Sequence, residues 1–498
     1  MKLKVKDIDI ATGLPLVAIV NKKDANKLDL YYEDRILIKK GKQCVVAITN
    51  ISESNKVVSE GKIGLCEEVL KKINSKTGDS VNISIVSRPA SLSYIRKKLN
   101  KGKLSYKEFY EIIQDIINNR LSQVETAYFV AACYTHELDL KESVSLTNAM
   151  VNTGETLKLK RYPVMDKHCI GGVAGNRTTM IVLPIVAAAG LAMPKTSSRS
   201  ITSPAGTADT MEVLANVNLS VSEMKNIVEK INGCLVWGGS LNLAPADDKI
   251  IRVEHPLSLD PVGQLLASVL AKKKSVSATH LLIDIPLGKG AKIETRKKAM
   301  KYKKLFEEIC KKLGIQVNVI ITDGSQPIGN GIGPSLEARD VLWVLKNHPN
   351  QPYDLREKSL KMAGIMLEMG KKAKKGQGYK KALEILESGK AYEKMCEIIK
   401  AQGGKTINPE NVKVGKLRYD FKAKKNGTIL HIDNKSISKI ARASGAPQSI
   451  ASGVYIHKHA GQKVKKHEKI ITIYSENRSK LNYAVDILEK INGIKVIS

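Results

Sequence analysis

Aromatic residues, paired cysteines and long apolar runs are all scarce in this chain. Phe, Trp and Tyr make up 4% of it, so a nucleic-acid-binding surface would have few rings on which to stack bases. The seven cysteines include no Cys-x-x-Cys pair, which argues against the common zinc motifs and favours reduced thiols. The most apolar stretch, 180–193, is shorter than a membrane span and contains Pro184. We therefore expect neither a membrane segment nor a metal site.

The beginning of the chain also lacks the apolar core of a secretory signal, because lysines alternate with apolar residues over 1–6. Together with the scattered thiols, this predicts a cytoplasmic protein. A length of 498 residues predicts roughly two to four domains. The hydrophobic content of 43% is ample for their cores.

The net charge of +32 raises the alternative of an RNA-binding protein that uses its basic surface. The lysines, however, are spread along the whole chain, and the sequence contains no helix-turn-helix, zinc-finger or RNA-recognition signature. A lysine-rich surface that attracts anionic substrates explains the charge more simply. Nucleic acid is therefore not an expected partner, and RNA binding stays the alternative from another class of function.

Local patterns predict an α/β protein in four parts. Short apolar runs between Lys, Asp, Asn and Gly predict a small β-rich domain over 1–88, which we expect to serve assembly. Helical periodicity with two capping boxes predicts a helical domain over 91–163, and we expect a segment near 245–275 to complete it. Alternating strand and helix patterns predict a large α/β domain with a mixed or parallel sheet over 164–425. Residues 426–498 are predicted to form a C-terminal β-rich α+β portion, in which 454–457 and 469–473 have a hairpin-like arrangement.

The segment 166–207 contains two loops with the composition of an anion site. The glycine-rich loop 171–175 precedes a predicted helix, and glycines there let backbone N–H groups approach a phosphate. Lys167 and Arg177 are expected to place positive charge beside this loop. The second loop is crowded with hydroxyls around Arg199, and hydroxyls, amides and a cation are donors that bind phosphate. A glycine-rich loop alone is often only a tight turn, but two such loops favour an anion site.

Several motifs of the chain share their order and spacing with one known family. They are Asp-Lys-His-x-x-Gly-Gly-Val at 166–173, Ser-x-Arg at 197–199, Gly-Thr at 206–207, Leu-Ala-Pro-Ala-Asp at 243–247, Ala-Ser-x-Leu-Ala-Lys-Lys at 267–273, and Ser-Gly-Lys-Ala at 388–391 with Ala-Gln-Gly-Gly at 401–404. From about residue 91 onward the chain resembles the thymidine and pyrimidine-nucleoside phosphorylase family. The sequence motifs at 199–210, 237–239 and 329–334, together with the extra N-terminal domain, resemble those of the archaeal-type AMP phosphorylase branch.

The resemblance implies a phosphorylase that uses no cofactor. AMP, with CMP and UMP as further candidates, would react reversibly with inorganic phosphate to give the free base and ribose 1,5-bisphosphate. The resemblance also implies a helical domain and an α/β domain that close over the substrates, in a dimer or larger homo-oligomer. A phosphorylase for unphosphorylated nucleosides remains the nearest alternative. The expected partners are therefore a nucleoside 5′-monophosphate, inorganic phosphate and further copies of the chain.

The resemblance further implies roles for individual residues. Asp260 is the expected proton donor to the leaving base, with a helix-capping aspartate as the structural alternative. The expected nucleotide-binding residues are Gly172, Ser198, Arg199, Ser200, Ile201, Thr202, Ser203, Thr207, Ser268 and Lys292. The expected phosphate-binding residues are Lys167, Cys169, Thr178, Ser197 and Thr207, with Cys169 in place of the usual serine. The weaker candidates near the ribose or base are His168 and Lys272.

Overall fold

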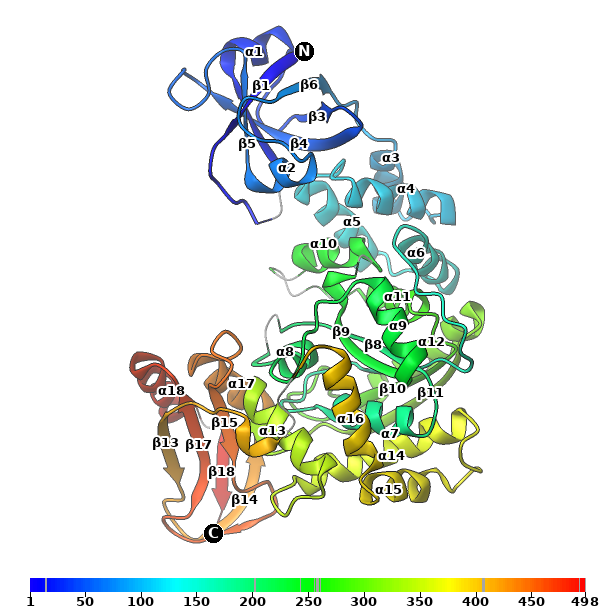
Figure 1. Cartoon of the computed structure of the whole chain (residues 1–498), viewed down its shortest axis with the longest axis vertical. Coiled ribbons are helices and arrows are strands. Elements are labelled where there is room, and N and C mark those ends of the chain that lie inside the picture. Colours follow the sequence, from blue (N-terminus) through cyan, green and yellow to red (C-terminus); the bar gives the residue numbers. More distant parts are fainter. Residues whose placement is uncertain are drawn as a thin grey trace. The chain divides into compact units, whose positions relative to one another are not determined.

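The protein is described by a computed structural model (Figure 1). The described residues are all except 14–15, 201–202, 242, 255, 257–258, 260, 405–407, 492 and 498. They fall into two compact units, the first comprising Met1–Thr153 with Ala244–Ser268 and the second comprising Gly154–Leu243 with Val269–Ser498. The predicted α/β class is confirmed, since both helices and strands build the described chain. Among the described helices, none is both long and apolar enough to cross a membrane.

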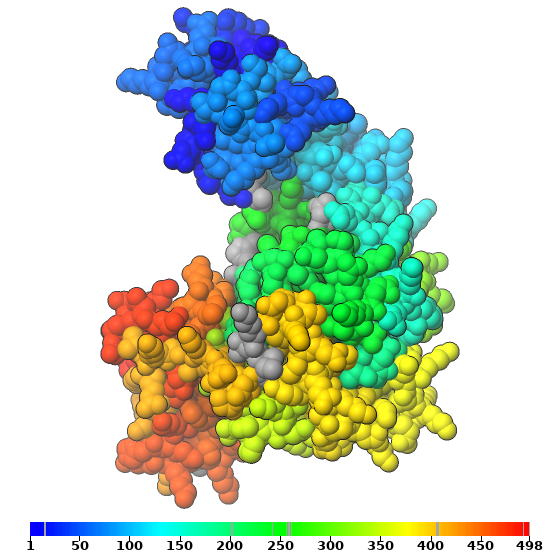
Figure 2. Space-filling model, viewed as in Figure 1, coloured from blue at the N-terminus to red at the C-terminus, as the bar shows by residue number. Residues whose placement is uncertain are grey.

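The first unit begins with a closed β-barrel, blue in the space-filling view (Figure 2). Its strands are β1 (Lys2–Asp7), β2 (Val17–Asn21), β3 (Arg35–Lys40), β4 (Gln43–Ser52), β5 (Lys62–Leu65) and β6 (Ser80–Ile85), in the order β1-β5-β2-β4-β3-β6. Alternate side chains such as Ile36 and Ile38 are fully buried inside the barrel. The short helices α1 (Lys22–Lys27) and α2 (Glu67–Lys72) contribute apolar side chains to the same core.

Helices make up the rest of the first unit. They are α3 (Ser91–Leu99), α4 (Tyr106–Ile117), α5 (Gln123–Thr135), α6 (Leu140–Asn152) and α10 (Pro245–Glu254), with α11 (Val262–Ser275) beginning there. The capping boxes expected at Ser105 and Ser122 are present, and Asp139 begins α6 with a third. Lys249 of α10 donates to the backbone oxygens of Ile116 and Ile117 at 2.8 Å each, at the C-terminal end of α4. An ammonium there is favoured by the helix dipole.

The second unit is built on parallel strands, as expected. The strands are β7 (Met165–Cys169), β8 (Met193–Ser197), β9 (Gly233–Trp237), β10 (His280–Leu287) and β11 (Gln316–Asp323). They pair in parallel in the orders β11-β10-β7 and β8-β9, and a bridge between Val164 and Ala192 joins β7 to β8. All these strands therefore end at the same edge of the sheet, where open α/β sheets bind their ligands.

Helices cover this sheet and connect its strands. They are α7 (Thr178–Ala188), α8 (Thr207–Glu212), α9 (Val221–Ile231), α12 (Arg296–Leu313), α13 (Pro334–Leu345), α14 (Tyr353–Met369), α15 (Gly378–Glu387) and α16 (Lys390–Ala401). Helix α7 is buried from Thr178 to Ala187 and packs against α14 and α16. The apolar character of this short segment, which includes Pro184, is therefore explained by its burial in the core of the protein.

The C-terminal portion of the second unit forms small antiparallel sheets with two helices and its own apolar core. Its elements are β13 (Leu417–Lys422), β14 (Gly427–Ile432), α17 (Asn434–Ala443), β15 (Gly453–Ile456), β16 (Lys463–Val464), β17 (Lys469–Ser475), α18 (Arg478–Lys490) and β18 (Ile494–Ile497). The predicted hairpin pairing of the segments near 454 and 470 is confirmed by β15 and β17. The loop after β11 also contributes β12 (Gly331–Ile332), which pairs with β15 and so joins the α/β part to this sheet.

Candidate active site

The predicted anion loop follows β7 at the carboxyl edge of the parallel sheet. Cys169 of β7 is paired with Asp284 of β10, and Lys167 lies two residues before Cys169. Because side chains alternate along a strand, these three side chains lie on the same face of the sheet. Lys167 and Asp284 are buried and Cys169 is half-buried. The structure thus brings a lysine, a thiol and a carboxylate together at the start of the loop.

A chain of hydrogen bonds connects Lys167 to Cys169 through the start of α7. The ammonium of Lys167 donates to the hydroxyl of Thr178 at 2.5 Å and lies 3.4 Å from that of Thr179. The Thr178 hydroxyl donates to the Asn176 side-chain oxygen at 2.9 Å, and the Asn176 amide donates to the sulfur of Cys169 at 3.3 Å. Three expected phosphate-binding residues are therefore neighbours, and Asn176, which the sequence prediction missed, joins them.

Burial sets the protonation states in this group. Burial raises the pKa of the Cys169 thiol to about 12, and the nearby carboxylate of Asp284 adds to the shift. The thiol therefore stays protonated at neutral pH and can donate weakly to an anion. Burial also lowers the pKa of Lys167 from its ordinary value. A bound anion would favour its charged form.

Two of the loop glycines are needed for close packing between loops. Gly172 has a φ of +88°, and a Cβ there would lie 2.2 Å from the backbone nitrogen of Lys292. Gly175 has a φ of +73°, and its Cβ would lie 2.3 Å from the backbone oxygen of Ile328. For Gly171 no described atom lies within 4 Å of the Cβ position. Gly172 and Gly175 are therefore required for the packing of the loops, whereas open space lies beside Gly171. Gly172 stays an expected nucleotide-binding residue, because its backbone N–H is not affected by this packing.

Arg177 does not add unbalanced positive charge to the loop, contrary to expectation. Its guanidinium pairs with the buried carboxylate of Glu337 and donates to the hydroxyl of Thr210 at 3.0 Å. It also donates to the backbone oxygens of Asn176, at 3.0 Å, and of Ala205. A buried guanidinium needs such partners because it cannot give up its charge. Arg177 therefore ties the start of α7 to the loop before α8.

Arg199 is likewise occupied by acids. It forms a two-point ion pair with Glu212, with one nitrogen–oxygen distance of 2.7 Å, and lies 3.3 Å from Asp209. Its guanidinium also stacks over the ring of Trp237, 4.8 Å from the centroid. The side chain is half-buried, and the ion pair with Glu212 raises its pKa further. An incoming anion must therefore compete with Glu212 for this arginine.

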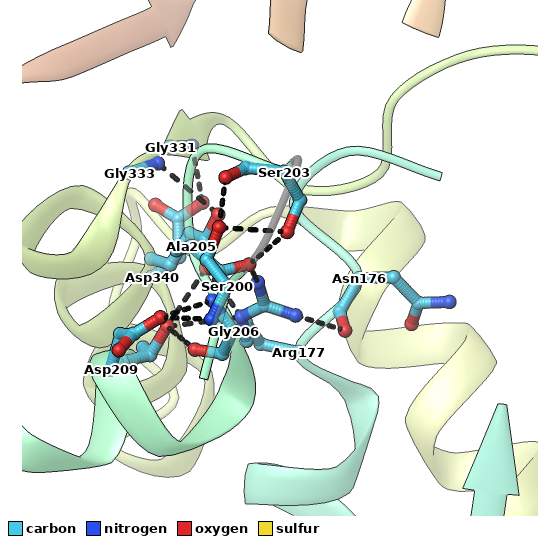
Figure 3. Close-up of polar contacts among 12 residues, drawn as sticks. Asn176, Arg177, Ser200, Ser203, Ala205, Gly206, Asp209, Gly331, Gly333 and Asp340 are labelled. Carbon is cyan, nitrogen blue, oxygen red and sulfur yellow. Dashed lines mark hydrogen bonds and ion pairs between the residues drawn. The ribbon is translucent and has the colours of Figure 1, made fainter. Parts of the chain in front are cut away.

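Carboxylates also hold the hydroxyl-rich segment 198–207. Asp209 accepts from the backbone nitrogens of Ser200 and Gly206 at 2.7 and 2.8 Å (Figure 3). A Cβ on Gly206 would lie 2.5 Å from the backbone oxygen of Ser198, so the end of β8 and the start of α8 are neighbours. The structure thereby brings three expected residues together, namely the half-buried Ser197, the exposed Ser198 and the half-buried Thr207. Ser200 and Ser203 contact each other nearby, whereas Ile201 and Thr202 lie outside the described residues.

The opposite face of β7 carries a second buried ionic group. Asp166 lies 2.9 Å from the ammonium of Lys273 and 3.5 Å from that of Lys195. Burial lowers the pKa of Lys195 to about 7. Burial, with four lysines around it, lowers the pKa of His168 well below its ordinary value, so this imidazole is neutral at neutral pH. His168 and the half-buried Lys272, which precedes Lys273 on α11, remain candidates for neutral and cationic contacts.

Two further expected site residues are Ser268 and Asp260. Ser268 is half-buried on α11 in the first unit, one helical turn before Lys272 on the same helix. Asp260, the expected proton donor, lies outside the described residues. Within the described part of the chain, no group of three or more His, Cys, Asp or Glu side chains is arranged to hold a metal ion.

Comparison with known proteins places the chain in a family. Residues 92–154 match the helical bundle domain of the glycosyl transferase family, residues 161–392 match its a/b domain, and residues 428–495 match the pyrimidine nucleoside phosphorylase C-terminal domain. The AMP phosphorylase of Pyrococcus furiosus is 46% identical over 497 residues, covering 100% of this chain and 98% of that protein. The chain belongs to the AMP phosphorylase family.

Two other likenesses bear on this family membership. A putative thymidine phosphorylase of Legionella pneumophila (strain Corby) is 45% identical and covers 93% of this chain and 89% of that protein. The anthranilate phosphoribosyltransferase of Thermus thermophilus is 18% identical with a TM-score of 0.53, and covers 62% of this chain and 99% of that one. The first relative is named for thymidine, a nucleoside, and not for a nucleotide. The second shows the shared fold alone.

Membership of the AMP phosphorylase family confirms the resemblance found from motifs. The motifs did not reveal which polar side chains hold the loops in place. Asn176, Asp209 and Glu337 each hold a predicted site segment in place. Asn176 had a local signal, because it directly precedes the Arg-Thr-Thr that begins α7. Glu337 lies 160 residues from Arg177, so no local pattern connects the two.

Proposed function

We propose that the chain is an AMP phosphorylase. It converts AMP, and CMP or UMP as further candidates, with inorganic phosphate into the free base and ribose 1,5-bisphosphate, and it catalyses the reverse reaction. The observation that carries this proposal is the buried ammonium of Lys167 at the strand edge. Hydroxyls contact it, and no described carboxylate lies within 4.0 Å of it. A phosphate dianion supplies the missing negative charge. The relatives named AMP phosphorylase support the choice of nucleotide.

The phosphate binds beside Gly171, where the backbone leaves space. Lys167, the protonated thiol of Cys169 and the hydroxyl of Thr178 donate to its oxygens, and the Thr178 hydroxyl turns from Asn176 to do so. The hydroxyls at the ends of β8 and the start of α8, from Ser197 and Thr207, complete the set. Fixed donors of this kind hold the nucleophile without the entropy cost of a free encounter.

The reaction exchanges one bond at C1′ of the ribose. A phosphate oxygen attacks C1′ while the bond from C1′ to the base nitrogen breaks, so the ribose carries oxocarbenium-like positive charge in the transition state. The bound dianion stabilises that charge. The bonding electrons leave with the base, and Asp260 donates a proton to a ring nitrogen of the base as it departs.

The nucleotide is held by loops on the same sheet edge and by α11. Gly172 and Lys292, which lie side by side, and the segment 198–207 face the ribose and its 5′-phosphate. Arg199 joins them only when the incoming phosphate replaces Glu212 as its partner. The family resemblance alone assigns Ser268 to the nucleotide and Lys272 to the base, and His168 offers a neutral imidazole to the ribose.

We further propose that the enzyme acts in the cytoplasm and as a homo-oligomer. The substrate assignment is tested by incubating the purified protein with phosphate and each of AMP, CMP, UMP, adenosine and thymidine. Base release and ribose 1,5-bisphosphate are measured together by chromatography. We expect both products from AMP and little turnover of the two nucleosides. Faster release of thymine from thymidine than of adenine from AMP would favour the nucleoside phosphorylase instead.

A further inference from the structure

Lys358 has no role in the site described so far. It lies on α14 with its side chain 11% exposed, and its ammonium nitrogen is buried. Its ammonium lies 3.5 Å from a carboxylate oxygen of Asp284, and no described residue forms a hydrogen bond with this nitrogen. An ammonium group has three protons to donate, and burying it without acceptors costs free energy.

Asp284 connects Lys358 to the expected phosphate-binding residues. The backbone oxygen of Asp284 accepts a hydrogen bond at 3.0 Å from the backbone nitrogen of Ile170, which directly precedes the glycine-rich loop. In the sheet, Asp284 is paired with Cys169. One carboxylate oxygen accepts from the hydroxyl of Thr322 at 2.6 Å, and the other faces Lys358. Lys358 acts electrostatically on the titration of both Lys167 and Cys169. The ammonium therefore lies on the face of the sheet that carries the expected phosphate ligands.

The charges on this face do not balance. Lys167 and Lys358 supply two positive charges, and Asp284 supplies one negative charge, while the Cys169 thiol is neutral. Arg177, by contrast, is matched by Glu337. A buried group with one excess positive charge is stabilised when an anion enters.

We propose that Lys358 is a second lysine ligand of inorganic phosphate, on the same face of the sheet as Lys167. This inference rests on the proposed phosphorolysis and assigns Lys358 to the attacking phosphate. The 5′-phosphate of AMP carries the same chemistry, so the test separates the two sources. With two ammonium groups as donors, the phosphate is held as a dianion and its attacking oxygen is directed at C1′.

The test replaces Lys358 with Met, which keeps the length of the side chain and removes its charge, and with Arg, which keeps the charge. Lys361, exposed one turn later on the same helix, provides the control Lys361→Met. The KM for phosphate at saturating AMP and the KM for AMP at saturating phosphate are measured for each variant. We expect Lys358→Met to raise the KM for phosphate roughly 10- to 100-fold, the effect of losing a charge-assisted hydrogen bond, with the KM for AMP nearly unchanged. Lys358→Arg should recover part of the loss, and Lys361→Met should match the wild type.

A change in the KM for AMP in place of that for phosphate would overturn the assignment. A purely structural role, in which Lys358 only neutralises Asp284, is tested in the Asp284→Asn background. There, Lys358→Met should still raise the KM for phosphate by a similar factor, and restored phosphate use would contradict the proposal.

Protection by phosphate alone provides a readout that does not depend on turnover. Phosphate should raise the melting temperature of the wild type and of Lys361→Met, and raise that of Lys358→Met much less at the same concentration. If the protein does not cleave AMP but phosphate protection still depends on Lys358, the proposed function fails and the phosphate site stands. Equal protection of the wild type and Lys358→Met would overturn the site itself.

Discussion

Cys169 supplies a protonated thiol where the phosphorylases that this chain resembles usually have a serine. Its sulfur accepts from the amide of Asn176, so the weak S–H donor is directed elsewhere and can reach an anion. Replacing Cys169 with Ser gives a stronger donor of similar shape. We expect the KM for phosphate to fall by roughly fivefold, which corresponds to about 1 kcal/mol for one hydrogen bond. The same change at Cys44, which is exposed on the barrel, is the control. Loss of activity in Cys169→Ser would instead reveal a role for sulfur that the geometry does not explain.

Asp260 is the proposed proton donor to the leaving base. As an acid near neutral pH it needs a raised pKa, which burial among substrates would provide. Asp260→Asn keeps the shape and capping ability but removes the acidic proton. We expect a folded protein whose kcat for AMP is lower by roughly 10²–10⁴-fold, the usual effect of losing a general acid. An analogue whose base leaves without protonation should lose much less. Near-normal turnover of AMP would show that Asp260 only caps a helix.

Among the helices and strands, those whose own sequence contains a clear capping or apolar pattern could be predicted from the sequence. The capping box at Ser122 predicts a helix over 123–135, and the apolar run 233–237 predicts a strand. Helix α5 (Gln123–Thr135) and strand β9 (Gly233–Trp237) have these bounds. Strands β1 and β5 were missed, although Leu3 and Val5 alternate with lysines as in a half-buried strand. Their parallel pairing joins segments more than fifty residues apart, and short strands become recognisable only through such partners.

The candidate site was predicted in its residues but not in its electrostatics. Motif spacing predicted Lys167, Cys169 and Thr178, and the structure brings them together. Composition also suggested free arginines beside the loops, and these proved to be paired with acids from distant segments, such as Glu337 for Arg177. Charge pairing between distant elements depends on the packed fold, so composition cannot predict it.

The loop that forms β12 has a built-in pH response. The carboxylate of Asp340 accepts from the backbone nitrogens of Asn330 and Gly331 at 2.7 and 2.6 Å, and burial raises its pKa to about 7 from 3.8 (Figure 3). Because the folded state binds this proton more tightly than the unfolded state, the contribution of Asp340 to stability is present at low pH and lost as the pH rises towards about 7. Asp340→Asn removes this titration.

We therefore expect the free energy of unfolding of the wild type, relative to Asp340→Asn, to fall between pH 5 and pH 7. The slope can reach about 1.4 kcal/mol per pH unit for one proton. Urea denaturation at a series of pH values measures it. A difference between the two proteins that stays constant over this range would contradict a raised pKa at Asp340.

At the scale of the whole molecule, the barrel is the part without a catalytic grouping. Its own apolar core is closed, and Arg35 of β3 pairs with Glu125 of α5 within the first unit. Deleting residues 1–88 should leave a folded remainder but change the number of subunits per particle, since we expect the barrel to serve assembly. Light scattering on the purified truncated protein measures this. If the truncated protein has the same number of subunits per particle as the full chain, the barrel does not serve assembly.

In the proposed reaction, phosphate itself attacks C1′ of AMP. Phosphate labelled with ¹⁸O, incubated with AMP and the wild-type protein, follows this bond directly by ³¹P NMR and mass spectrometry. We predict that adenine is released and that the label appears in the 1-phosphate of ribose 1,5-bisphosphate, while the 5′-phosphate stays unlabelled. Release of adenine with unlabelled ribose 5-phosphate would mean hydrolysis by water. That result, or turnover of nucleosides with AMP untouched, would rule out phosphorolysis of AMP.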